Sequence, residues 1–345
     1  MSVTAPPRVL AASTEVLRFH RQLVSPEHPL PAGLGARRVG RGAGALPARL
    51  LEPERDVIDA WTFTGQSAGQ SAGESAEHRH GCIRYTTDGH WLLGVAEVDD
   101  SAIGLQAAAE RAYRDLFELL ATGPCAHPFR LWNYMSRIND EVGGTERYRQ
   151  FNAGRQQAFA EAGRSAFEGA PAACALGLRE GPLQVGVLAG RVAPLALENP
   201  RQVSAYRYPA EYGARSPSFS RAALAAIGGA RKVLFVSGTA SIVGHTTVHV
   251  GDVRRQTEES LLNIATLRTV AAERSGAGFA ADALTYTLYI RHASDLPLVR
   301  EVFEREVGAG SLAAREAIYL QADICRADLL VEIEAHGFTP PSTDA

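Results

Sequence analysis

The sequence predicts an α+β fold of two modules, each a mixed sheet with helices packed on one face. Apolar segments of strand length alternate with segments whose apolar residues recur at helical spacing. The second half follows the order β-α-β-α-β-β, and the spacing of the first half is similar. A chain of 345 residues has room for two domains. We expect an N-terminal α+β domain over residues 1–190, a divergent relative of the C-terminal domain over residues 191–345.

The sequence pattern predicts few helices or strands in the first hundred residues. Residues 1–50 are rich in Pro, Gly, Ala and Arg without a sustained period, so we expect them to wrap the surface. The polar tandem repeat at 65–76 is typical of a mobile loop, and HRHGC at 78–82 reads as an exposed loop rather than a metal tract. Asp88-Gly89 between two apolar runs indicates a β-hairpin.

The rest of the first half alternates helix and strand. Residues 101–123 form an amphipathic pattern, with apolar positions at helical spacing: Leu105, Ala108, Ala112, Leu116 and Leu119 or Leu120. A strand is expected at 128–139, a helix at 146–163, and two or three strands between 174 and 209.

The second half repeats this rhythm. The pattern predicts helices at 256–274 and 295–308, and strands at 232–237, 283–291, 316–322 and 329–335.

Composition excludes several classes of function. The net charge is −3 without a basic block, which disfavours a nucleic-acid partner, and no apolar run is long enough to span a bilayer. The four cysteines form no CxxC pair and no zinc spacing, so we expect no metal. The N-terminus lacks the pattern of a secretory signal, and we expect a cytoplasmic protein.

A small, hydroxyl-rich segment follows the apolar strand at 232–237. Ser237, Gly238, Thr239 and Ala240 would expose backbone N–H groups and two hydroxyls that could cradle a carboxylate or an enol oxygen. The alternative is an ordinary tight turn. Neither form of glycine-rich phosphate loop occurs there.

Three arginines in or near irregular segments are candidate carboxylate ligands. Arg215 and Arg221 lie in a Pro-, Gly- and Ser-rich stretch together with Tyr212, and a guanidinium pairs with a carboxylate through two hydrogen bonds. A solvated surface loop is the alternative. Arg155 follows Gly154, a residue that costs a helix about 1 kcal/mol relative to alanine, so a packing or ligand reason is expected there.

The last strand carries two acidic residues on one face. Glu332 and Glu334 alternate with Val331 and Ile333, so the carboxylates point away from the apolar side. A partly desolvated glutamic acid has a raised pKa and can act as a general acid. A solvated strand face is the alternative. Cys325, a little earlier, is either a small buried residue or part of the same pocket.

Six segments resemble the chorismatase family. They occur in the family's order from about residue 125 onward: FRLWNYMSRIN at 129–139, ERYRQFNAGR at 146–155, YGARSPSFSRA at 212–222, SGTASIVGH at 237–245, QTEESLLNIATL at 256–267 and VEIEAHG at 331–337. The C-terminal half is also similar to the RidA/YjgF fold, with its strand-end Ser-Gly turn and terminal acidic strand.

The resemblance implies an enzyme that removes the enolpyruvyl group of chorismate, with Glu332 as the acid that protonates its methylene carbon. The family divides at two positions, occupied here by Gly238 and Cys325, a pair that resembles the branch forming 3-hydroxybenzoate. The close alternative is the hydrolytic branch, which gives a dihydroxycyclohexadiene carboxylate. A non-catalytic RidA-like metabolite-binding module is an alternative of another class.

Further expectations follow from the same resemblance. The substrate's two carboxylates would be bound by Arg155, Arg215 and Arg221, with Tyr212 and the SGTA segment beside them. Neither a metal nor an organic cofactor is implied. The protein is expected to be a monomer or a trimer.

Overall fold

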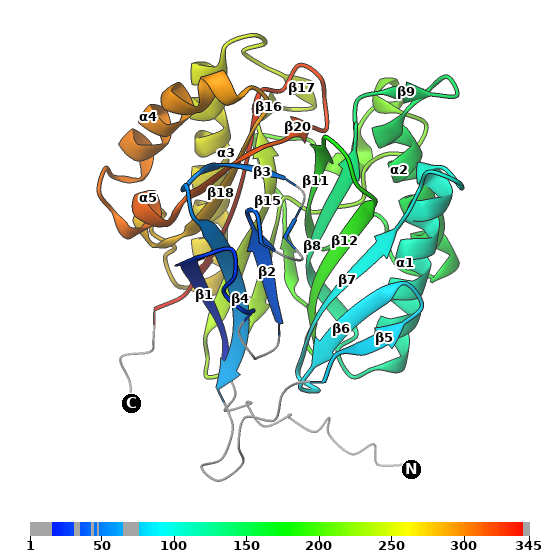
Figure 1. Cartoon of the computed structure of the whole chain (residues 1–345). Helices are drawn as coiled ribbons and strands as arrows, with labels where there is room; N and C mark the ends of the chain where they lie inside the picture. Colours follow the sequence, from blue (N-terminus) through cyan, green and yellow to red (C-terminus); the bar gives the residue numbers. More distant parts are fainter. Residues whose placement is uncertain (1–15, 31–34, 43–44, 47, 65–75, 341–345) are drawn as a thin grey trace, which may run out of the picture.

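The computed structural model describes residues 16–30, 35–42, 45–46, 48–64 and 76–340. Helices cover two outer sides of the molecule, and two large sheets lie between them (Figure 1). Within the described residues, no helix combines the length and apolar character needed to cross a membrane.

The first large sheet belongs to the N-terminal half. Its strand order is β20-β11-β8-β12-β7-β6-β5, with β8 and β11 parallel and all other neighbours antiparallel. Helices α1 (Leu105–Thr122) and α2 (Arg147–Glu161) pack on it and bury the apolar positions predicted for the first helix. The strands are β5 (His78–His80), β6 (Ile83–Thr87), β7 (Trp91–Val98), β8 (His127–Ser136), β11 (Ala172–Leu178), β12 (Leu183–Gly190) and β20 (Asp323–Ile324).

The second large sheet belongs to the C-terminal half. Its order is β13-β14-β15-β21-β18-β19-β3, with β18 and β19 parallel and all other neighbours antiparallel. Helices α3 (Val253–Ser275), α4 (Leu296–Val307) and the short α5 (Leu312–Glu316) cover its outer face. The strands are β3 (Arg49–Glu52), β13 (Leu195–Leu197), β14 (Ala222–Ala226), β15 (Lys232–Ala240), β18 (Thr285–Ile290), β19 (Ile318–Gln321) and β21 (Val331–Phe338).

The two halves share one topology. In each sheet the parallel strands flank the second helix: β8 and β11 flank α2, and β18 and β19 flank α4. The final strand then inserts in the middle, β12 between β7 and β8 and β21 between β15 and β18. The predicted α+β fold of two related modules is confirmed.

The modules are interlocked by short strands. β20, from the C-terminal half, pairs with β11, and β3, from the N-terminal half, pairs with β19. The gap between β12 and β13 coincides with the predicted boundary at residue 190. The division into domains 1–190 and 191–345 stays a prediction.

The N-terminal segment forms a third sheet, contrary to the expectation for residues 1–50. β1 (Val16–Val24), β4 (Asp56–Thr64) and β2 (Gly35–Val39) are antiparallel in the order β1-β4-β2. The apolar pattern of the sequence did not predict this sheet, because buried charged residues, including Arg38, Asp56 and Asp59, interrupt the alternation of its strands. The exposed HRH segment is the edge strand β5 rather than a loop. The tandem repeat at 65–75 lies outside the described residues.

Smaller elements lie in the connections. These are the hairpins β9 (Glu141–Val142) with β10 (Thr145–Glu146) and β16 (Ile242–Val243) with β17 (Thr246–Thr247), and the 3-10 turns η1 (Ala205–Arg207), η2 (Ala210–Tyr212), η3 (Ala281–Ala283) and η4 (Ala293–Asp295).

Packing explains the glycine inside α2. A Cβ atom on Gly154 would collide with the backbone oxygen of Gln106 in α1 and would lie 3.0 Å from the backbone nitrogen of Glu110. The glycine therefore allows α1 and α2 to cross closely.

We expect Gly154→Ala to destabilise the protein by about 1–3 kcal/mol, although alanine favours helices, because the crossing helices must separate. The midpoint of urea unfolding would fall. Gly278→Ala is the matched control, because a Cβ there meets open space. Equal stability of Gly154→Ala and wild type would contradict the packing explanation.

Candidate active site

A cavity of about 300 Å³ lies between the two modules. The first module supplies α2 and β11, and the second supplies β15, β21, the 208–221 loop and the segment before β21. The cavity therefore exists only where the two modules meet.

The segment predicted as a turn is a β-bulge. β15 continues through it to Ala240, so the expected strand end at residue 237 was wrong. Against β21, Ser237 and Gly238 together oppose the single residue Glu334. Small polar residues suit a bulge as well as a turn, which is why the sequence did not separate the two.

The Ser237 hydroxyl joins the two modules at the bulge, and the Thr239 hydroxyl bonds within β15. The Ser237 Oγ accepts a hydrogen bond from the Ala173 backbone nitrogen at 2.9 Å and donates one to the Ser220 carbonyl at 2.6 Å. The Thr239 hydroxyl donates to the Ser237 carbonyl at 2.7 Å. Both predicted hydroxyls are thus bonded to the backbone, and neither side chain lines the cavity.

Gly238 and Ala240 do line the cavity. A Cβ atom on Gly238 would collide with a carboxyl oxygen of Glu332 and would lie 3.0 Å from the Cβ of Cys174. The glycine at the bulge therefore makes room for the Glu332 carboxyl group.

Glu332 is the buried acid of the cavity. It is 3% exposed and projects from β21 on the face opposite to the apolar core. Burial raises its pKa to about 8, the negative charge of Glu334 adds to the increase, and Arg130 opposes it. The carboxyl group is protonated at neutral pH, so it can donate a proton.

Glu334, two residues further along β21, is held in the opposite state. It forms an ion pair with Arg130, accepts a hydrogen bond from the Tyr289 hydroxyl at 3.0 Å, and lies 3.7 Å from a nitrogen of Arg37. Burial acts to raise its pKa, but the two guanidinium groups outweigh burial and hold the pKa below its usual value. The two carboxyl groups thus differ in charge although both are buried.

Two of the predicted arginines line the cavity and are almost fully buried. Arg155 is 1% exposed and donates to the Asn152 side-chain oxygen at 2.8 Å. Arg221 is 5% exposed and donates to the Tyr208 hydroxyl at 2.7 Å. Among the described residues, neither guanidinium forms an ion pair, and the Nε atom of each lacks a hydrogen-bond partner.

Arg326 is a third guanidinium in the cavity, which the sequence analysis missed. Its central carbon lies 4.0 Å from the ring centroid of Tyr212, which also lines the cavity as predicted. Its buried Nη2 atom has no hydrogen-bond partner in the described part of the chain. Its position directly after Cys325, a predicted site residue, is the sequence feature that could have identified Arg326. Arg215, by contrast, is exposed and does not line the cavity.

Cys325 lines the cavity beside the acid. Burial raises the pKa of its thiol to about 12, and the Glu332 carboxyl group adds to the increase. The thiol is therefore protonated at neutral pH and offers a small neutral surface rather than a nucleophile.

The arrangement suits a small substrate with two negative groups and a site of protonation. Three guanidinium groups with unsatisfied donors can bind carboxylates, and a neutral buried acid faces the same space. No group of three or more metal-ligating side chains occurs among the residues that the structure describes.

Comparisons with known proteins agree with this chemistry. Residues 69–189 match the family model described as chorismatase FkbO/Hyg5-like, N-terminal. The chain is 38% identical to a 3-hydroxybenzoate synthase of Streptomyces hygroscopicus over 75% of this chain and 78% of that protein. It is 39% identical to a chorismatase of Streptomyces rapamycinicus over 74% of this chain and 77% of that protein.

A solved chorismatase structure shows a similar match. A crystal structure of a chorismatase aligns with a TM-score of 0.77 and 28% identity, over 95% of this chain and 99% of that one. A YjgF-family protein of Mycobacterium tuberculosis aligns over 35% of this chain and 86% of its own, with 26% identity and a TM-score of 0.25.

The raised pKa of Glu332 predicts a pH-dependent stability difference between wild type and Glu332→Gln. The pKa is about 8 in the folded protein against 4.5 ordinarily, so the stabilising contribution of Glu332 is complete below pH 4.5 and is lost as the pH rises to 8. Unfolding midpoints from pH 4.5 to 9 should show wild type losing stability relative to the variant, and then a plateau.

The control for that series is Glu301→Gln, which changes an exposed carboxylate on the outer helix α4. The unfolding midpoints of Glu301→Gln should change with pH in the same way as those of wild type. A constant difference between wild type and Glu332→Gln across this range would show that Glu332 is ionised in the folded protein.

Proposed function

The chain belongs to the chorismatase family, and from that premise we infer an enzyme that cleaves chorismate to 3-hydroxybenzoate and pyruvate. The observation that carries the inference is the coexistence, in one cavity, of a protonated buried carboxyl and three guanidinium groups with unsatisfied donors. Chorismate offers the matching groups, because it carries two carboxylates and one vinyl ether.

Substrate binding uses the positive groups of the cavity. Arg155, Arg221 and Arg326 would hold the two carboxylates, since their free N–H donors are the buried groups that most need acceptors. Tyr212 stacks against Arg326 and limits where that guanidinium can lie. Binding in this way fixes the vinyl ether against the acid.

Glu332 starts the reaction by protonating the methylene carbon of the enolpyruvyl group. The adjacent carbon becomes an oxocarbenium centre, which weakens the bond from the ether oxygen to ring carbon C3. The C4 hydroxyl oxygen then attacks C3, the C3–O bond breaks, and pyruvate leaves. The Glu332 carboxylate accepts the proton that the hydroxyl loses, so the acid is regenerated.

The ring intermediate is an epoxide that opens to the arene. The two products together contain the same atoms as chorismate, so this route consumes no water. The hydrolytic branch, in contrast, consumes one water and leaves a non-aromatic diene. Gly238 and Cys325 line the cavity next to Glu332, which supports a role for both in selecting the route.

Both modules of the chain line the cavity. This supports a catalytic unit that is complete within a single chain. The choice between monomer and trimer, and the cytoplasmic location, stay predictions.

Glu332→Gln should reduce pyruvate release from chorismate by about 10²-fold or more, because the amide cannot donate a carboxylic proton. Pyruvate is measured with lactate dehydrogenase and NADH, and chorismate binding by calorimetry should persist. Glu301→Gln should retain wild-type rates. If wild type itself released no pyruvate, a metabolite-binding module would replace the enzyme.

Gly238→Ala combined with Cys325→Ala should shift the product from 3-hydroxybenzoate toward the diene. The added methyl group displaces the Glu332 carboxyl, and loss of the Sγ atom opens space for water beside it. Chromatography of the products with ultraviolet detection measures the ratio. An unchanged ratio would remove both positions from the control of the route.

A further inference from the structure

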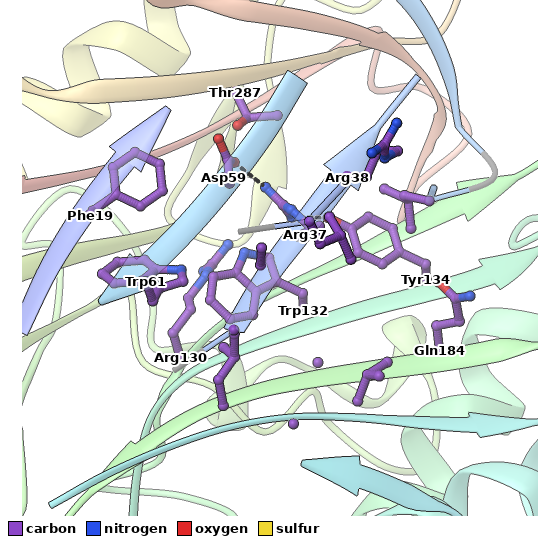
Figure 2. A pocket seen from close by; sticks show the side chains of 18 of the residues that line it. Phe19, Arg37, Arg38, Asp59, Trp61, Arg130, Trp132, Tyr134, Gln184 and Thr287 are labelled. Carbon is purple, nitrogen blue, oxygen red and sulfur yellow. Dashed lines mark hydrogen bonds and ion pairs between the residues drawn. The ribbon is translucent and has the colours of Figure 1, made fainter. Parts of the chain in front are cut away.

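A second and larger cavity, of about 590 Å³, lies on the same face of β21 as the candidate active site, further along the strand beside Glu334 and His336. Its walls come from the N-terminal sheet β1-β4-β2, from β7, β8 and β12 of the first module, and from β18 and β21 of the second. Figure 2 shows Arg37, Arg130, Trp61 and Trp132 gathered around one space. The N-terminal sheet thus encloses a space that the proposed reaction does not use.

A chain of buried ion pairs runs along this cavity. Arg21 binds Asp59 at 2.7 Å, Arg37 lies 3.1 Å from Asp59 and 3.7 Å from Glu334, and Arg130 pairs with Glu334. Three guanidinium groups therefore share two carboxylates, and the cluster carries one net positive charge. A buried charge without a partner is costly, so the cluster favours one added negative charge.

Other charged side chains around the cavity do not neutralise the cluster. Arg38 pairs with Asp56, and Arg84 lies 3.8 Å from Glu77 at the exposed rim. Glu97, also at the rim, is exposed and accepts a hydrogen bond from Gln184, so its charge is solvated and is not paired with the cluster.

His336 adds no charge to this cavity. Burial lowers its pKa to about 3, assisted by Arg21 and Arg130 and opposed by Asp59 and Glu334. The imidazole is therefore neutral at physiological pH.

Three buried polar atoms of the cavity lack partners in the described part of the chain. They are the Nη1 of Arg130, a residue that is 2% exposed, the Nε of Arg38 and the Nε2 of His336. A carboxylate beside Arg130 would accept the hydrogen bond that Nη1 cannot give within the protein.

Aromatic side chains provide flat walls next to these donors. The guanidinium carbons of Arg37 and Arg130 lie 5.5 and 5.4 Å from the Trp132 ring centroid. The ring centroids of Phe19 and Trp61 lie 4.9 Å apart, with the ring planes tilted by 58°, on the N-terminal side of the same cavity. Such walls select a planar, apolar ring.

We propose that this second cavity binds an aromatic monocarboxylate, with the carboxylate on Arg130 and Arg37 and the ring against Trp61 and Trp132. A single negative charge matches the net charge of the cluster, whereas a dicarboxylate would leave one charge unpaired. The aromatic product of the proposed reaction belongs to this class, but the binding itself does not depend on that reaction.

The test uses benzoate as the probe and tryptophan fluorescence as the readout. Two of the chain's three tryptophans, Trp61 and Trp132, line the second cavity, and none lines the active-site cavity. Benzoate should quench wild-type fluorescence with saturation. Arg37→Met should weaken the binding about tenfold or more, because the cluster loses its net charge while Asp59 and Glu334 keep Arg21 and Arg130.

Two further variants separate the sites. Arg254→Met, on the outer surface of α3, is the matched control and should bind benzoate like wild type. Arg155→Met alters only the active-site cavity and should leave the fluorescence titration unchanged. Benzoate binding is read by fluorescence and not by pyruvate release, so the outcome for the second cavity is independent of the reaction.

A crystal soaked with 4-bromobenzoate locates the probe even if Arg37→Met does not fold. The anomalous signal of bromine should lie between Trp61 and Trp132. Bromine in the active-site cavity alone, or quenching with the same affinity in Arg37→Met and wild type, would overturn the proposal.

Discussion

The proposed chemistry depends on two buried carboxyl groups that lie two residues apart on one strand face and differ in charge. Glu332 and Glu334 cannot both ionise cheaply in a low-dielectric interior, and Arg130 and Arg37 fix the charge on Glu334. Glu332 consequently keeps its proton near neutral pH. Each carboxyl lines a different cavity, so β21 carries the candidate active site and the second cavity side by side on one face.

The fold was predictable wherever burial is one-sided. Helices α1 and α3 follow the apolar period because one face packs on a core and the other does not. The N-terminal sheet was missed because its inward residues include Arg21, Arg38 and Asp59, which are stabilised by one another rather than by apolar contact. Ion pairs between distant segments leave no local period in a sequence.

The candidate site was predictable only in part, because tertiary contacts between distant segments leave no local period in the sequence. Alternation on β21 placed Glu332 and Glu334 on one face, but it could not distinguish solvent from a second module covering that face. Arg155 and Arg221 are buried and line the cavity, whereas Arg215, in the same loop as Arg221, is exposed. Which arginine of an irregular loop turns inward depends on tertiary contacts such as the bond from Arg221 to the Tyr208 hydroxyl.

The exchange of short strands has a consequence for how the chain matures. β3 can pair with β19 only after β19 has been synthesised, and β11 can pair with β20 only after β20 has been synthesised. Domains ordinarily fold one after another as the ribosome delivers them. In the nascent N-terminal half, β3 and one edge of β11 therefore stay unpaired until the C-terminal half has been synthesised. The complete fold forms late and involves the whole polypeptide.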